Sequence, residues 1–130
     1  MNEIESVDRD GMGAVKISEE VVKTVAGMAA VDIAGVAGMS GGLTGGFAEL
    51  LGRKNLSKGI KVAVGDKEAA IDIFVILEYG VRVPEVAANM QNKVKNAVES
   101  MTGLKVVEVN IHVQGVVFPS EQKELDRRVK

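Results

Sequence analysis

Residues 60–79 read IKVAVGDKEAAIDIFVILEY, and this stretch decides the fold. From residue 60 to residue 64, apolar residues alternate with small or polar ones, and residues 65–68 then break the run. The second run places five residues on one face of an extended strand: Ile71, Ile73, Val75, Leu77 and Tyr79. Because Phe74 and Ile76 make its other face apolar as well, we predict a β-hairpin whose second strand is central in a sheet.

A helix and a further strand follow the hairpin. Pro84 and Glu85 suit the first turn of a helix, and Gly103 suits its end. Between them, apolar residues recur at steps of three or four along one stripe: Val86, Met90, Val94, Val98 and Met101. After Gly103, apolar and polar residues alternate over residues 107–114. This alternation predicts a strand with one exposed face.

The N-terminal part shows a similar order of strand, helix and strand. Residues 14–17 suit a short strand, and Ser18 with the two following acids suits a helix start. Apolar residues then recur at helical spacing, at Val21, Val22, Val25, Met28 and Ala29. This helix should end near residues 32–35, and residues 36–39 suit a brief strand. Because each helix is long enough to return the chain in parallel, we predict an α+β fold: a two-layer, mixed β-sheet with two main helices packed on one face.

The chain of 130 residues fits one domain with two tails. Residues 1–13 carry four acids and one base without periodicity, and we expect an acidic flexible tail. Residues 14–118 are the expected α+β domain, interrupted by a glycine-rich loop. Residues 119–130 are the expected charged C-terminal tail. Leu125 and Val129 would share one face of a helix there, which suggests a partner-binding tail; a tail that only keeps the protein in solution is the other interpretation.

The composition excludes several classes of protein. Hydrophobic residues make up 46% of the sequence and aromatic residues 3%, so the core must be aliphatic. The absence of Cys excludes disulfides, thiolate nucleophiles and sulfur-ligated zinc. A net charge of −2, with a neutral middle, argues against nonspecific nucleic-acid binding. The sequence begins without a basic and then apolar leader and has no apolar run of about eighteen residues, so we expect a cytoplasmic protein that does not span a membrane.

Three segments carry a resemblance to a known family: GAVKIS at residues 13–18, GVAGMSG at residues 35–41 and VVEVNIHVQGV at residues 106–116. In this order they resemble the alkaline-shock protein family of Gram-positive bacteria. The resemblance implies a cytoplasmic protein of the cell-envelope stress response that is held near the membrane by small anchored partners. It implies no catalytic residue, because the family offers no active-site motif to transfer.

The side chains that could carry chemistry are few. His112 is the single histidine, and it lies on the polar face of a predicted strand. A metal would need further His or Cys ligands, and no serine lies in a nucleophile motif. Glu108 could face Asp72 or Glu78 across the sheet, but nothing in the sequence places these acids together. We therefore interpret these side chains as solvated and predict no catalytic residue, no cofactor, no metal and no enzymatic activity.

The loop region allows an RNA-binding alternative. Gly42, Leu43, Thr44 and Gly45 match the GxxG loop with which KH domains clamp an RNA backbone. Here a strand is predicted before the loop, which favours a flexible linker. Four bases follow without an acid between them: Arg53, Lys54, Lys58 and Lys61. They suit contact with an anionic surface, such as lipid headgroups, and equally a solvated charged loop.

These features favour binding over catalysis. Mean hydropathy is +0.14 although 26% of the residues are charged, which suggests that apolar surface remains for association. We therefore predict a non-enzymatic interaction protein of the cell-envelope stress response. It would form a homo-oligomer or bind a membrane-anchored protein at the cytoplasmic side of the membrane, as a peripheral protein of the inner face. RNA binding through the GxxG loop and the adjacent bases is the alternative function.

Overall fold

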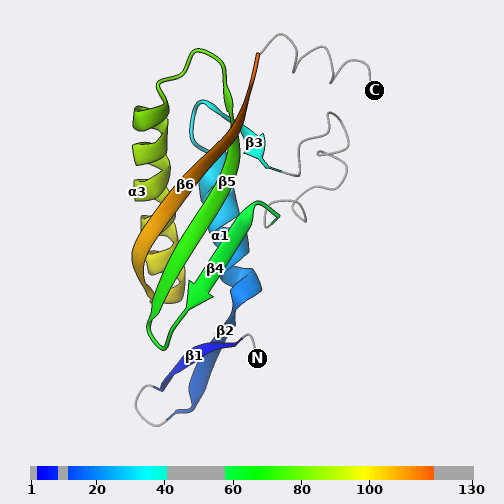
Figure 1. Ribbon diagram of the computed structural model, residues 1–130. Coiled ribbons are helices and arrows are strands. Elements are labelled where there is room, and N and C mark those ends of the chain that lie inside the picture. The colour runs from blue at the N-terminus through cyan, green and yellow to red at the C-terminus, as the bar shows by residue number, and fades with distance from the viewer. Residues whose placement is uncertain (1–2, 9–11, 41–57, 119–130) are drawn as a thin grey trace.

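β5 (Glu68–Glu78) is the central strand of the main sheet in the computed structural model, which describes residues 3–8, 12–40 and 58–118 (Figure 1). β6 (Lys105–Val117) pairs in parallel with one edge of β5, to which it is connected through α3 (Val83–Thr102). β3 (Val36–Met39) and β4 (Ile60–Val64) both pair antiparallel with β5. The sheet is therefore mixed, as the sequence predicted.

β3 and β4 share one edge of β5 and meet end to end at Phe74. β4 pairs with the first half of β5, and β3 pairs with the second half. At the junction, the N–H of Ser40 donates to the carbonyl oxygen of Phe74 at 2.8 Å, and the N–H of Phe74 donates to the carbonyl oxygen of Gly59 at 2.7 Å. The two short strands therefore act as one edge strand that is interrupted between Ser40 and Gly59.

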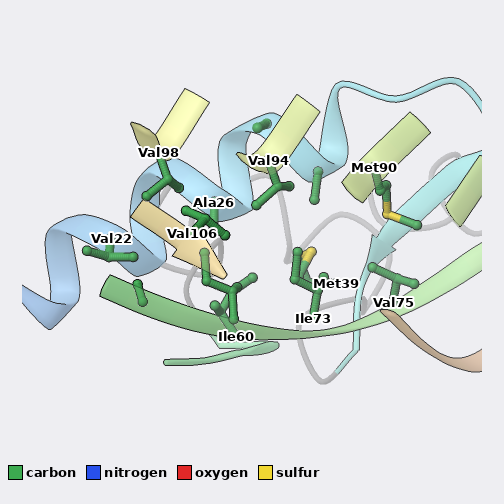
Figure 2. Packing of buried hydrophobic residues seen from close by; sticks show 14 of the residues in the cluster. Val22, Ala26, Met39, Ile60, Ile73, Val75, Met90, Val94, Val98 and Val106 are labelled. Atoms are coloured by element: carbon green, nitrogen blue, oxygen red, sulfur yellow. The ribbon is translucent and has the colours of Figure 1, made fainter. Parts of the chain in front are cut away.

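The core lies between one face of the sheet and the two helices, α1 (Glu19–Val31) and α3 (Figure 2). Val22 and Ala26 of α1 and Met90, Val94 and Val98 of α3 point toward the sheet. The buried hydrophobic residues of the described chain are Val22, Ala26, Ala29, Ala30, Met39, Ile60, Ala69, Ile71, Ile73, Val75, Leu77, Val86, Met90, Val94, Val98, Leu104 and Val106. All of them are aliphatic or Met, as the low aromatic content required.

Both helices start and end where the sequence predicted. The side chain of Ser18 accepts a hydrogen bond from the N–H of Val21 at 3.4 Å, so one unpaired donor of the first turn of α1 is satisfied. Pro84 lies in the first turn of α3. Gly103 follows α3 with a φ of 79°, a left-handed conformation that favours glycine because it lacks a Cβ.

The N-terminal strands differ from the prediction. β2 (Ala14–Ser18) does not join the main sheet; it pairs antiparallel with β1 (Glu3–Asp8) in a separate two-stranded sheet that projects from the body (Figure 1). The expectation that α1 connects two parallel strands of one sheet is therefore wrong. The sequence predicts a flexible tail over residues 1–13 because this segment is acidic and has no periodicity, whereas residues 3–8 form β1 in the structure. The division of the chain at residues 13 and 118 stays a prediction.

The close approach at the β3–β4 junction yields a test of the fold. A Cβ atom at Gly59 would lie 2.7 Å from the carbonyl oxygen of Phe74 and 3.2 Å from the Cβ of Met39. Because the backbone must shift to relieve these contacts, Gly59→Ala should lower the free energy of unfolding by about 1–3 kcal/mol. Denaturant titration measures this. Gly65→Ala is the matched control, since its nearest atom would be 4.0 Å away, and equal stability of the two variants would contradict the tight junction.

Candidate interaction surface

The face of the sheet opposite the helices is uncovered by the described residues. Along β5, residues 71, 73, 75 and 77 are buried under the helices, whereas the alternate residues are only partly buried. The parallel register sets Asp72 beside Asn110 and Phe74 beside His112. On the other edge, Lys61 of β4 lies beside Asp72. Three strands therefore bring polar and aromatic side chains together on this open face.

These five side chains, Lys61, Asp72, Phe74, Asn110 and His112, form what we call the open-face cluster. The amide of Asn110 donates to Oδ1 of Asp72 at 2.9 Å, and Nε2 of His112 lies 3.3 Å from the same oxygen. The rings of Phe74 and His112 stack with centroids 4.3 Å apart and an interplanar angle of 10°. Nζ of Lys61 lies 5.5 Å from the centroid of the Phe74 ring. The cluster is thus a connected surface network around one carboxylate and one aromatic ring.

A bulge in β6 places the polar residues of that strand on the open face. Val106 pairs with Ala69 and is buried, but the next pair joins Glu108 to Ala70, so Val107 is an extra residue. Because side chains alternate between faces, this one-residue shift turns Val109 toward the helices and Asn110 toward the open face. Without the bulge, Asp72 and Phe74 would lie beside apolar residues of β6.

The cluster lowers the pKa of Asp72 below its ordinary value of 3.8. The largest cause is the hydrogen bond from Asn110, followed by the hydrogen bond from His112; the charges of His112 and Lys61 act in the same direction, and desolvation opposes them. Asp72 therefore keeps its negative charge to lower pH than a free aspartate. It is solvated, with 39% of its side chain exposed, so it serves as a fixed charge on the surface.

The acids and the histidine do not assemble a reactive centre among the described residues. Glu108 lies beside Ala70 in the parallel register, so the neighbour of Asp72 is Asn110 and not a second carboxylate. The hydroxyl of Ser40 donates to Oε1 of Gln114 at 2.9 Å. Within the described residues, no group of three or more His, Cys, Asp or Glu side chains could hold a metal ion. The arrangement is suited to hydrogen bonding and stacking with a partner.

The aromatic residues of the described chain all lie outside the core. Phe74 is stacked on His112 at the open face. Tyr79 and Phe118 lie at the end of the β5–β6 pair with ring centroids 4.6 Å apart, and they are 63% and 46% exposed. The sequence placed Phe74 on the second face of a central strand and Tyr79 with the buried face, so the exposure of Tyr79 is a correction. Tyr79 follows the last residue of β5, where the helices no longer cover the sheet.

A shallow polar groove runs along α3 beside the end of α1. It is lined by Ile33, Asn89, Asn92, Lys93, Asn96, Ala97 and Ser100. Lys93 forms an ion pair with Asp32, and this contact lowers the pKa of Asp32. The groove is open to solvent and collects no reactive group.

The site residues proposed from the sequence are only partly described. Lys61 lies in the open-face cluster, and Lys58 is exposed beside the β3–β4 junction. The other proposed site residues lie outside the described residues: Gly42, Leu43, Thr44, Gly45, Arg53, Lys54, Leu125 and Val129. Sequence reasoning missed the Asp72–Asn110–His112 contacts, because they depend on the register between β5 and β6. No described helix is both long enough and apolar enough to cross a membrane.

Comparisons with known proteins give one consistent family. Residues 7–118 match the model of the alkaline-shock protein 23 family, which is described as having a cell envelope-related function. The chain is 37% identical over 114 residues to uncharacterized protein YqhY of Bacillus subtilis, spanning 88% of this chain and 84% of YqhY. It is 43% identical over 110 residues to uncharacterized protein YloU of the same organism, spanning 83% and 92%. A stress response regulator gls24 homolog of Streptococcus pyogenes is 28% identical over 122 residues, spanning 90% and 68%.

The hydrogen bonds at Asp72 predict how its carboxylate titrates. In an NMR titration, the pKa of Asp72 should lie below 3.8 and should rise toward that value in Asn110→Ala. Because folding lowers this pKa, the carboxylate stabilises the protein above the unfolded-state pKa, and the contribution is lost as the pH falls through the folded-state pKa. Gln114→Ala is the control, since Gln114 bonds to Ser40 and not to Asp72. An unchanged pKa in Asn110→Ala would contradict the network.

Proposed function

This chain belongs to the alkaline-shock protein 23 family, whose function is related to the cell envelope, and on that premise we propose that it is a non-enzymatic binding protein of the envelope stress response. It associates with copies of itself or with a membrane-anchored protein on the cytoplasmic side of the membrane, where it is a peripheral component.

The position of the aromatic residues carries this proposal. A chain with 3% aromatic residues has few large side chains for its core, yet Phe74, Tyr79 and Phe118 all contribute to its surface. Large aromatic side chains are enriched at the centres of protein interfaces, where they bury much area at little conformational cost. While Tyr79 and Phe118 are exposed to solvent, the chain does not gain the free energy of burying these two rings. A protein partner at this end of the sheet would recover it.

The family relations support the same class of function. The stress response regulator gls24 homolog of Streptococcus pyogenes is similar over 90% of this chain, which supports a role in the stress response. The open-face cluster offers a partner one fixed carboxylate, two hydrogen-bonding side chains and a stacked ring pair. The polar groups can make directional hydrogen bonds around the apolar ring of Phe74, which resembles the polar rim and apolar core of protein interfaces.

The aromatic pair supplies the test. Tyr79→Ala with Phe118→Ala should weaken capture of the partner from detergent-solubilised host membranes at least tenfold, which corresponds to about 1.4 kcal/mol or more. Because both rings are exposed, the unfolding free energy should fall only by about the value of one aromatic pair, 0.5–1.5 kcal/mol. The measurement is cross-linking followed by mass spectrometry of the captured proteins.

Met101→Ala is the matched control for this experiment. Met101 is 71% exposed and lies near the end of α3, away from the aromatic pair, so its truncation should leave capture unchanged. If the unsubstituted protein, the Tyr79→Ala/Phe118→Ala variant and Met101→Ala capture the partner equally, the aromatic pair has no role in binding. A chain that is monomeric and captures no membrane protein would overturn the proposed function, and RNA in place of protein would favour the alternative.

A further inference from the structure

The two edges of the main sheet differ in length and charge. One edge consists of β3 and β4, with four and five residues, and carries Lys61. The other edge is β6, with thirteen residues. Residues 109–118 of that edge contain no Lys, Arg, Asp, Glu or Pro. Short strands, charges and prolines are the features with which natural sheets prevent edge pairing. Apart from a bulge after Val113, β6 lacks them over this part.

α3 covers only the first half of the β6 edge. Nε2 of Gln91 donates to the carbonyl oxygen of Val109 at 3.0 Å, and the N–H of Val106 donates to the carboxylate of Glu99 at 2.9 Å. These two backbone groups of β6 therefore point away from β5. Beyond Val109, the described residues make no hydrogen bond to the outer backbone of the strand. The carbonyl oxygen of Val117 points inward and accepts from the N–H of Tyr79.

The outward backbone groups are arranged symmetrically about His112. Successive residues of a strand direct their N–H and C=O groups to opposite edges, so Ile111 and Val113 share the outward direction of Val109. An antiparallel second copy could set its Val113 beside Ile111 and its Ile111 beside Val113. Each pairing would exchange reciprocal N–H···O=C bonds, with a two-fold axis at His112.

The chemistry of this segment fits a copy of itself. A two-fold axis sets each residue of the segment near the same residues of the second copy, so a Lys, Arg, Asp or Glu near the axis would face a like charge. Residues 109–118 contain none of these, and His112 on the axis is paired with Asp72 of its own chain. The neighbouring side chains of Val113, Val116 and Phe118 are 37%, 51% and 46% exposed, and a second copy would cover part of this apolar surface. A strongly charged peptide would find no complementary charge here.

From this juxtaposition we infer that the outer edge of β6 pairs antiparallel with the β6 edge of a second copy, so that two sheets join into one continuous sheet centred on His112. This inference rests on the self-association included in the proposed function. It names the surface and the register, and it is independent of the membrane-anchored partner.

A single cysteine tests the register, because the chain has no cysteine of its own. His112→Cys would place two thiols directly opposite each other in a non-hydrogen-bonded pair, with Cβ atoms about 4.5–5.5 Å apart, which is close to disulfide geometry. Glu108→Cys is the matched control: it is exposed on the same strand and face, but its two copies would lie about 26 Å apart. Under mild oxidation, His112→Cys should form disulfide-linked dimers at least tenfold faster.

Light scattering of the unsubstituted protein separates this inference from the proposed function. Dimers that show no preferential cross-linking at residue 112 overturn the β6 pairing and leave self-association standing. A chain that stays monomeric at millimolar concentration overturns both the β6 pairing and self-association. Binding of a membrane protein to Tyr79 and Phe118 is tested by the separate capture experiment. Cross-linking of residue 112 to another protein in place of a second copy also overturns the pairing.

A second variant keeps the inference testable if His112→Cys folds poorly. Val113→Lys places a charge beside the axis and should weaken the dimer at least tenfold, because burying an unpaired charge in the joined sheet is costly. Val21→Lys is the control, since Val21 is 44% exposed on α1, away from β6. An unchanged dimer in Val113→Lys would show that the edge is not the interface.

Discussion

Complete burial of one face of β5 is the constraint on which the rest of the structure depends. Ile71, Ile73, Val75 and Leu77 have no exposed surface, and β3, β4 and β6 are each hydrogen-bonded to this strand. Burial of side chains of this size contributes about 1.5–3 kcal/mol each. A slip of β5 by one residue would replace them with the opposite face, including Asp72, so the register is fixed from the core outward.

The same constraint leaves a surface for function. Both helices pack on the buried face of β5, and the described residues provide no second layer for the other face. The residues of that face form a partly exposed network instead of a core. In a two-layer protein, one sheet face is therefore available for recognition at no cost to the core. Beyond the end of β5, Tyr79 and Phe118 provide a second exposed surface, which is aromatic.

Periodicity predicted the elements, but it could not predict how β5 and β6 align. The alternation in β5 and the stripe of α3 gave the central strand, the crossover helix and the α+β class, because these patterns reflect burial directly. The contacts of Asp72 depend on the bulge at Val107, and two adjacent valines at residues 106 and 107 were the only sequence signal of that shift. The pairing of β1 with β2 was missed because it involves few residues and no core. The site residues proposed in the loop and the C-terminal tail stay predictions.

The interruption of the β3–β4 edge lies beside Phe74. Ser40 follows one short strand, Gly59 precedes the other, and the backbone of both residues bonds to Phe74. The side chain of Ser40 also bonds to Gln114 across β5. Phe74 therefore links the two short edge strands through its backbone and belongs to the open-face cluster through its ring, so a change at this residue of β5 would disturb both the edge and the surface.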